Sequence, residues 1–391
     1  MKKTHQRFRR FAAILVGIVL IVSGLLKIID PVGTMLKVQE YMKFLHLAFL
    51  LPSAKVLGTV LAVFETMLGI ALITGVLRKL AAWCTYILLG FFTVITLILW
   101  IKNPDMDCGC FGEAIHLSHA QSFWKNVILL ALTVFAFTPF HDFGRPRPNR
   151  VVAACIAALS VLYAVWYSNT HLPIIDFTPF HLGTELYASL DDNLAADNHY
   201  KAAYVYEKDG KEGVFELSGL PDSTWTFVRV DTVFRKTTTV SEEYPILSFS
   251  DAEGEYHDHD AVEGRTVIIS VYDHSDISWE KVREQYSMTV EADGTPIVLV
   301  SATPSDPSLP TDIPVYYADY KTLVTLNRSN GGGTYFFEGE MISQWDVNHL
   351  PKDLKADFDQ DPVDLSTSLI IKRRLRTQGF CVYLAALLLL V

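Results

Sequence analysis

The chain has few cysteines, and their absence from one long segment limits its chemistry. Five cysteines occur among 391 residues, and none lies between residues 156 and 380. A domain built from that segment must fold without disulfides. Sulfur chemistry is therefore expected only in the N-terminal part of the chain.

Acidic residues are scarce in the first part of the chain and abundant in the second. Residues 1–150 carry 7 aspartates and glutamates against 16 lysines and arginines, whereas residues 171–368 carry 36 against 13. So acidic a surface repels phosphate groups, and no nucleic-acid partner is expected.

Long apolar runs indicate a membrane part. Hydrophobic residues make up 50% of the chain and charged residues 19%, which predicts one part in lipid and one in water. Each of five runs approaches the roughly 20 residues that a spanning helix needs. They cover about residues 10–29, 56–77, 80–101, 122–140 and 151–168. No small-x-small cleavage site follows the first run, so it is predicted to stay as an uncleaved transmembrane helix.

The basic loops predict the orientation of these helices. Basic residues gather at the N-terminus, at Arg78-Lys79 and between Arg145 and Arg150. The positive-inside tendency then places the N-terminus in the cytoplasm. The loop after the third helix and everything after the fifth would face the outer, oxidising side. A further helix between Pro31 and Ser53 is expected on that outer surface.

A pair of cysteines separated by one residue is the strongest chemical signal. Cys108-Gly109-Cys110-Phe111-Gly112 lies in the loop between the third and fourth apolar runs. The two sulfurs can meet only if the chain turns sharply at Gly109, because an extended chain holds their Cα atoms at or beyond disulfide reach. A disulfide over so short a ring is expected to be reducible, which favours thiol exchange over stapling. The alternative is a pair of free thiols in a loop.

Two charged residues near the apolar runs are candidate functional groups. Glu65 lies in the middle of the second run and Lys27 at the end of the first. Ionisable groups at such depth face the bundle interior and pair with a partner. Glu65 could pair with Lys27, take up protons beside a quinone or the sulfurs, or serve only to hold helices together.

Other polar patterns carry weaker signals. His116 and His119 follow the cysteines, and these four potential ligands make a zinc site an alternative. Because the one-residue gap between Cys108 and Cys110 is poor for chelation, no metal is expected. Two aspartates beside Cys108 predict a raised thiol pKa. The run from His257 to Asp260 reads as a solvated loop, and Gly331-Gly332-Gly333 as a flexible turn.

The acidic part has the pattern of an α/β domain. Strands are predicted around residues 204–206, 225–228, 266–272 and 297–300, with a hairpin at 334–342. A helix over 276–288 between two strands predicts a β-α-β unit with parallel neighbours. This order suggests a thioredoxin-like domain, although Asp273-His274-Ser275-Asp276 stands where a Cys-x-x-Cys would be and no proline stands in the turn before the hairpin.

These residues together resemble the DoxX/MauE superfamily of membrane proteins. The resemblance is carried by the run Ser23–Pro31, by Glu65 with Gly75 and Arg78 after it, by Cys108–Gly112, and by Asn126. With a fifth helix and an acidic outer domain, the chain resembles a DoxX-related family of Bacteroidetes. The resemblance implies redox at a membrane, since MauE is linked to maturation of methylamine dehydrogenase and DoxX-type subunits to quinone-coupled sulfur oxidation.

The predicted architecture is an all-α transmembrane four-helix bundle with a fifth helix, fused to an α/β thioredoxin-like domain. We expect the bundle over residues 1–145, the fifth helix over 146–170 and the acidic domain over 171–365. A basic stretch with a short apolar tail, below spanning length, would cover 366–391.

The predicted function is a thiol/disulfide electron relay. Its site would be Cys108, Cys110, Glu65 and Lys27, with quinone as a candidate cofactor and either an extracytoplasmic client or a thioredoxin-like protein as partner. As an enzyme it would be a membrane thiol-disulfide or quinone oxidoreductase. The alternative is a non-catalytic membrane-anchored adaptor, while transport is disfavoured because no paired broken helices occur.

Overall fold

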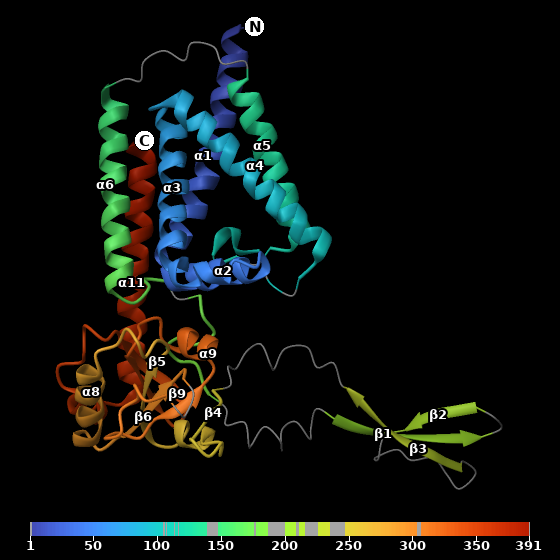
Figure 1. Cartoon of the computed structure of the whole chain (residues 1–391), viewed down its shortest axis with the longest axis vertical. Coiled ribbons are helices and arrows are strands. Elements are labelled where there is room, and N and C mark those ends of the chain that lie inside the picture. The colour runs from blue at the N-terminus through green and yellow to red at the C-terminus, as the bar shows by residue number, and fades with distance from the viewer. Residues whose placement is uncertain are drawn as a thin grey trace. The chain divides into compact units, whose positions relative to one another are not determined.

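The computed structural model of the chain contains two compact units. It describes residues 2–104, 106, 108–112, 114–115, 117–138, 148–175, 177–186, 200–208, 211–215, 226–234, 247–302 and 306–390. The membrane unit comprises Met1–Thr178 with Ile370–Val391, and the second unit comprises Pro179–Leu369 (Figure 1).

The regular elements in the described part of the membrane unit are helices, joined by short non-helical segments. Its helices are α1 (Lys2–Ile29), α2 (Pro31–Phe44), η1 (Ala48–Ser53), α3 (Ala54–Thr74), α4 (Arg78–Lys102), η2 (Gly109–Phe111), α5 (His119–Phe137), α6 (Pro148–Thr170) and the second half of α11 (Pro362–Leu390). Five of them are long and apolar enough to cross a membrane, namely α1, η1 with α3, α4, α5 and α6. The five predicted apolar helices are thus confirmed.

Helix α2 crosses the end of the membrane unit where α1 stops (Figure 1). Asp30 interrupts α1 and caps α2, its carboxylate accepting a hydrogen bond of 2.8 Å from the backbone nitrogen of Gly33. Pro31 occupies the first helical position, where its missing N–H costs nothing. The Asp-Pro step therefore turns the chain from a spanning helix into a short helix packed on α3, in agreement with the helix predicted between Pro31 and Ser53.

Glycines let α1 and α3 approach closely. A Cβ atom added to Gly24 would meet the hydroxyl of Thr66 and would lie 2.6 Å from the carbonyl oxygen of Ala62. Gly17 and Gly69 form a second such contact further along the same pair of helices. Small residues at helix contacts are the usual way for membrane helices to bring their backbones together.

Replacing Gly24 by alanine should destabilise the membrane unit. The methyl group has no space unless α1 and α3 separate, and such overpacking typically costs about 1–3 kcal/mol. The matched control is Gly90→Ala on α4, since a Cβ there meets nothing within 4 Å. Thermal unfolding of both variants in detergent tests this expectation, and equal stabilities would contradict it.

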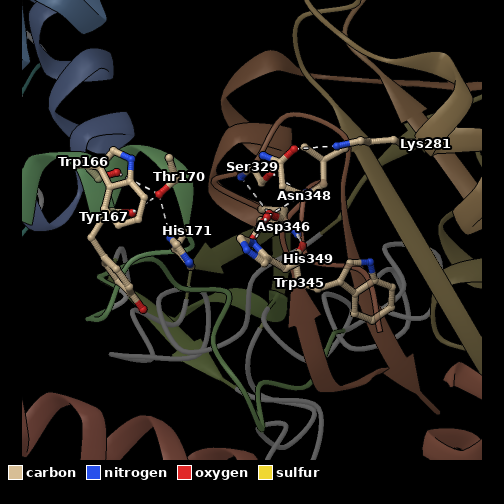
Figure 2. Close-up of polar contacts among 12 residues, drawn as sticks. Trp166, Tyr167, Thr170, His171, Lys281, Ser329, Trp345, Asp346, Asn348 and His349 are labelled. Atoms are coloured by element: carbon tan, nitrogen blue, oxygen red, sulfur yellow. Dashed lines mark hydrogen bonds and ion pairs between the residues drawn. The ribbon is translucent and has the colours of Figure 1, made fainter. Parts of the chain in front are cut away.

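The end of α6 is aromatic. The ring of His171 stacks on Tyr167 with centroids 4.3 Å apart, and its Nδ1 lies 2.8 Å from Thr170 Oγ1 (Figure 2). Trp166 lies on the same turn. Aromatic rings of this kind mark the boundary between lipid and water, which fits a spanning helix that ends here.

The C-terminal tail, expected as a basic stretch followed by a short apolar end, is part of a longer helix. Its residues form the second half of α11, a continuous helix of 29 residues. Thr377 Oγ1 lies 3.4 Å from the carbonyl oxygen of Ile174, and the hydroxyls of Tyr383 and Ser160 are in contact. The tail is therefore joined to the membrane unit beside α6, although α11 is not among the candidate spans in the described part of the chain.

The second unit is built around a six-stranded sheet with the order β4-β7-β6-β5-β8-β9. The strands are β4 (Phe249–Ser250), β5 (Arg265–Val271), β6 (Thr295–Val300), β7 (Tyr316–Ala318), β8 (Gly332–Phe337) and β9 (Glu340–Trp345). The helices around them are η4 (Asp258–Ala261), α8 (Trp279–Glu291), α9 (Tyr320–Leu326), α10 (Leu354–Asp359) and the start of α11. Strands β5 and β6, which precede and follow α8 in the chain, pair in parallel. Strands β8 and β9 form an antiparallel hairpin, so both predicted motifs are confirmed.

Alternation along β5 separates two apolar cores. Val267 and Ile269 pack with Val282 of α8 and Phe358 of α10, whereas Ile268 packs in the cluster that contains Leu323 of α9. Successive strand residues point to opposite faces, so the sheet is covered on both sides. The second unit is thus a mixed α/β domain, as predicted.

Strands β1 (Tyr200–Lys208), β2 (Lys211–Phe215) and β3 (Thr226–Phe234) form a separate antiparallel sheet with the order β2-β1-β3. One expectation for this part of the chain is wrong. Gly332 and Gly333 are buried at the start of β8 and are no flexible turn. The indole of Trp345 fills the space that a Cβ of Gly333 would need.

Candidate functional site

The two sulfurs of the sulfur loop (residues 108–112) lie in contact. Cys108 and Cys110 are free cysteines whose Sγ atoms are 3.2 Å apart, and the backbone nitrogen of Cys110 donates to the carbonyl oxygen of Cys108 at 2.8 Å. The predicted sharp turn is therefore present. Gly109 serves it differently from the expectation, because its φ is not positive and a Cβ there would lie 2.9 Å from Cβ of Lys37 on α2.

The two cysteines have different surroundings. Cys108 is 1% exposed, whereas Cys110 is partly exposed. The hydroxyl of Tyr41 on α2 lies 3.5 Å from Cys108 Sγ. Burial raises the pKa of Tyr41, so its hydroxyl stays protonated and can donate to the sulfur.

Hydrogen bonding sets the acidity of the pair. The hydrogen bond from Cys110, with smaller contributions from Tyr41 and the charge of Lys125, lowers the pKa of Cys108 to about 5, against the opposing effect of burial. The same hydrogen bond and burial raise the pKa of Cys110. The prediction that nearby aspartates raise the Cys108 pKa is wrong in direction, and Asp105 and Asp107 themselves lie outside the described residues.

A buried ion pair lies next to the sulfur loop. Lys27 Nζ is 2.8 Å from Glu65 Oε1 and 2.7 Å from Oε2, and the two side chains are 5% and 1% exposed. The hydroxyl of Ser23 lies 2.9 Å from Glu65 Oε2 and 2.8 Å from the carbonyl oxygen of Cys110, and it can donate to one of them at a time. Of the roles considered for Glu65, pairing with Lys27 is the one observed.

The ion pair and Cys110 face a shared cavity. Its volume is about 250 Å³, and α1 to α5 with the sulfur loop supply its walls. Apolar side chains such as Leu20, Leu61 and Phe92 line most of it. The polar groups on its wall are those of Ser23, Thr34, Lys27, Lys37, Tyr41, Glu65, Thr96, Cys110, Lys125 and Asn126. The cavity thus has the character of a small-molecule site, apolar with a few convergent polar groups.

All four predicted site residues therefore meet in one place. Lys27 and Glu65 line the cavity, Cys110 forms part of its wall and Cys108 lies behind Cys110. Tyr41 and Lys125 were missed as site residues. Ser23 had a detectable signal, because it precedes Lys27 by one helical turn and thus lies on the same helix face.

The metal alternative finds no support among the described residues. No group of three or more histidine, cysteine, aspartate or glutamate side chains in that part of the chain is arranged to hold a metal ion. His119 Nε2 lies 3.2 Å from the carbonyl oxygen of Pro104, and His116 lies outside the described residues. In the second unit, His257 is held between Asp251 and Asp260 at 3.2 Å each, and hydrogen bonding to these carboxylates raises its pKa.

In the second unit, the side chain of Asn330 forms hydrogen bonds with the backbone of the loop after β5. Asn330 Oδ1 accepts from the backbone nitrogens of Tyr272 and Asp273, each at 3.0 Å, and its Nδ2 donates to the carbonyl oxygens of Asp273 and Asp276. The sequence of this loop, Asp273-His274-Ser275-Asp276, has no cysteine. Its backbone is held in place by the hydrogen bonds to Asn330.

The groups of a neighbouring polar cluster also form hydrogen bonds with one another. The ring nitrogen Nδ1 of His349 lies 2.9 Å from both carboxylate oxygens of Asp346, and Ser329 Oγ accepts from the backbone nitrogen of Val347 at 3.1 Å (Figure 2). Lys281 donates to Asn348 in the same view. These bonds connect the loop after α9 to the loop after β9, and they point to a structural role.

Comparisons with known proteins give a family match for the membrane part. Residues 6–139 match the model of the family described as methylamine utilisation protein MauE, which supports a MauE-like membrane domain here. Residues 200–236 match a domain of unknown function, numbered 8463. No curated protein and no solved structure matches the chain.

Proposed function

We propose that the protein is a membrane thiol/disulfide relay whose reactive pair is Cys108 and Cys110. The observation that carries the proposal is the 3.2 Å contact of two thiols at the wall of a cavity that also holds the Lys27–Glu65 ion pair. Two thiols that can be oxidised to a disulfide and reduced again are suited to passing two electrons. The MauE match of residues 6–139 supports the membrane domain in which this pair lies.

The exchange has two balanced stages. A client dithiol transfers two electrons to the Cys108–Cys110 disulfide, leaving the client oxidised and the pair as two thiols. A lipid-soluble acceptor of the quinone class then takes two electrons and two protons from the pair, re-forming the disulfide and giving a quinol. Each stage conserves electrons and protons, and the pair returns to its starting state.

The cavity supports a quinone as the acceptor. Its volume of about 250 Å³ suits a single substituted ring rather than a large cofactor, and its walls are mostly apolar. Lys27, Lys125 and Asn126 present N–H donors that could hold quinone carbonyls. Lys27 and Glu65 would hold and move protons there, since they form a buried pair that can exchange a proton within its hydrogen bonds.

The proposal includes the placement and the finer fold of the protein. The four-helix bundle of the DoxX/MauE superfamily, as found in Bacteroidetes, would lie in the bacterial inner membrane with the N-terminus in the cytoplasm. The second unit would then lie outside the cytoplasm as a thioredoxin-like domain without cysteines. It would select the client protein or dock a separate thioredoxin-like partner.

A second candidate is a non-catalytic adaptor for an extracytoplasmic partner. The specific observation in its favour is the loop after β5, which has no cysteine and forms four hydrogen bonds with the side chain of Asn330. A domain that keeps a redox-like arrangement without its thiols can still bind partners.

Quinone reduction by the purified protein tests the relay. The full chain, reduced and reconstituted in lipid nanodiscs, is mixed with decylubiquinone, whose fully substituted ring cannot add thiols. We expect two thiols to be lost for each quinol formed, and none in the Cys108→Ser, Cys110→Ser double variant. Loss of thiols to an added disulfide peptide without quinol formation would contradict the quinone step, and inertness toward both acceptors would contradict the relay.

A further inference from the structure

We infer that Cys110 is the sulfur that forms the mixed disulfide with a partner, and that Cys108 is the buried sulfur that leaves and later closes the pair. This assignment rests on the proposed relay. It assigns different roles to two cysteines that the sequence presents as equivalent, and it follows from their different positions in the sulfur loop.

Access separates the two sulfurs. Cys108 is 1% exposed, and its backbone forms an isolated bridge with Leu117 that holds it beneath the loop. Cys110 is partly exposed and contributes to the cavity wall. Thiol exchange proceeds by attack along the line of the sulfur–sulfur bond, so the reagent must reach the sulfur that it attacks. Cys110, on the cavity wall, is the more exposed of the two sulfur-bearing residues and offers the better approach.

Leaving-group chemistry points the same way. The sulfur that leaves carries away the electron pair of the broken bond, and a thiol of low pKa leaves faster. When Cys108 leaves, Cys110 is bonded to the partner and has no S–H to donate. The Cys108 thiolate is then stabilised by the Tyr41 hydroxyl and by the positive charge of Lys125, both of which lower its pKa. The Tyr41 hydroxyl stays protonated and lies 3.5 Å from the sulfur, where it can stabilise a thiolate.

The resulting steps balance. A partner thiolate attacks Cys110 in the disulfide, a new sulfur–sulfur bond forms to Cys110, and the bond to Cys108 breaks with Cys108 leaving as thiolate. The partner's second thiolate then attacks the partner sulfur bound to Cys110. This releases Cys110 as thiolate and the partner as a disulfide, and two electrons have moved to the pair.

Ser23 positions the reactive sulfur. Its hydroxyl lies 2.8 Å from the carbonyl oxygen of Cys110 and 2.9 Å from Glu65 Oε2. The sulfur loop is thus connected to the Lys27–Glu65 pair through the backbone of Cys110. Ser23 is a positioning residue, since it acts on the loop and not on the reacting atoms.

Single-cysteine variants test the assignment. Cys108→Ser and Cys110→Ser are each made in the full chain with Cys84, Cys155 and Cys381 replaced by serine, and both are treated with oxidised glutathione in nanodiscs. We expect a stable glutathione adduct on Cys110 in the first variant, forming on the order of tenfold or more faster than any adduct on Cys108 in the second. Mass spectrometry of the intact chain reads the adduct.

The outcomes separate this assignment from the relay itself. An adduct that forms faster on Cys108, or equally fast on both, overturns the assignment while leaving the relay intact, provided that the chain with both cysteines still cycles between dithiol and disulfide. Inertness of that chain as well overturns both.

A second variant tests the role of Cys108 without removing a sulfur. Tyr41→Phe removes a donor to the Cys108 thiolate and should raise the pKa of Cys108. Reduction of the Cys108–Cys110 disulfide by glutathione should then slow, by on the order of a few-fold given the dependence of exchange on leaving-group pKa. A rate and pH profile equal to those of the unchanged chain would contradict Cys108 as the leaving sulfur.

Discussion

Glu65→Gln is expected to lower the free energy of unfolding of the membrane unit by about 3–5 kcal/mol, the usual cost of breaking a buried ion pair from one side. The substitution leaves the ammonium of Lys27 buried without its counter-charge, with both side chains 5% exposed or less. Lys27→Met should have a comparable effect through the unpaired carboxylate. Unfolding in detergent, followed by circular dichroism, measures both.

The matched control replaces the pair as a whole. Lys27→Met combined with Glu65→Leu removes both charges, and apolar replacement of a buried pair is often neutral for stability. The double variant should therefore be more stable than either single variant. If each single variant is as stable as the unchanged chain, Lys27 and Glu65 do not form a buried ion pair on the cavity wall, and the description of the site is contradicted.

Replacing both Cys108 and Cys110 by serine is expected to abolish the function of the protein in cells. The 3.2 Å contact of their sulfurs is the only contact between cysteines in the described part of the chain, so no other pair there could take over the exchange. Cys84→Ser with Cys155→Ser is the control, and we expect it to behave like the unchanged chain. Complementation of a strain that lacks the protein measures both.

The adaptor function makes the opposite prediction for this variant. A membrane anchor with a partner-binding domain does not need the sulfurs, so the double serine variant would complement the deletion. Full complementation, with the protein present at its normal level, would thus contradict the relay and favour the adaptor.

Much of the membrane unit can be predicted from the sequence because its signals are long or local. The apolar runs that became α1, α3, α4, α5 and α6 are defined by length and composition alone. The close pair of sulfurs follows from one-residue spacing and a turn. Glu65 and Lys27 were recognisable because charges inside apolar runs are costly and need a partner.

What the sequence did not reveal depends on contacts between distant residues. Tyr41 reaches Cys108 across 67 residues, and nothing local to Tyr41 marks it. The acidity of Cys108 depends on that contact and on Cys110, so neighbouring aspartates gave the wrong direction. Gly333 looked like a flexible turn because its covering side chain, Trp345, comes from the next strand.

In the second unit, local patterns predicted elements better than their assembly. The parallel pair β5 and β6 around α8 follows from alternation and from the helix between them. Alternation cannot say which sheet a strand joins, so it did not reveal that β1, β2 and β3 form a sheet of their own. The C-terminal apolar tail likewise belongs to a longer helix, since its basic residues continue α11 without a break.

The redox state of Cys108 and Cys110 in intact cells tests the central claim most directly. Thiols are trapped with a membrane-impermeant maleimide mass tag before and after treatment with a reductant, in a chain whose other cysteines are serine. The relay predicts no tag before reduction and tagging of Cys110 after it, which marks an outward-facing disulfide. Thiols that are tagged without reduction, or that stay untagged after it, would contradict the relay.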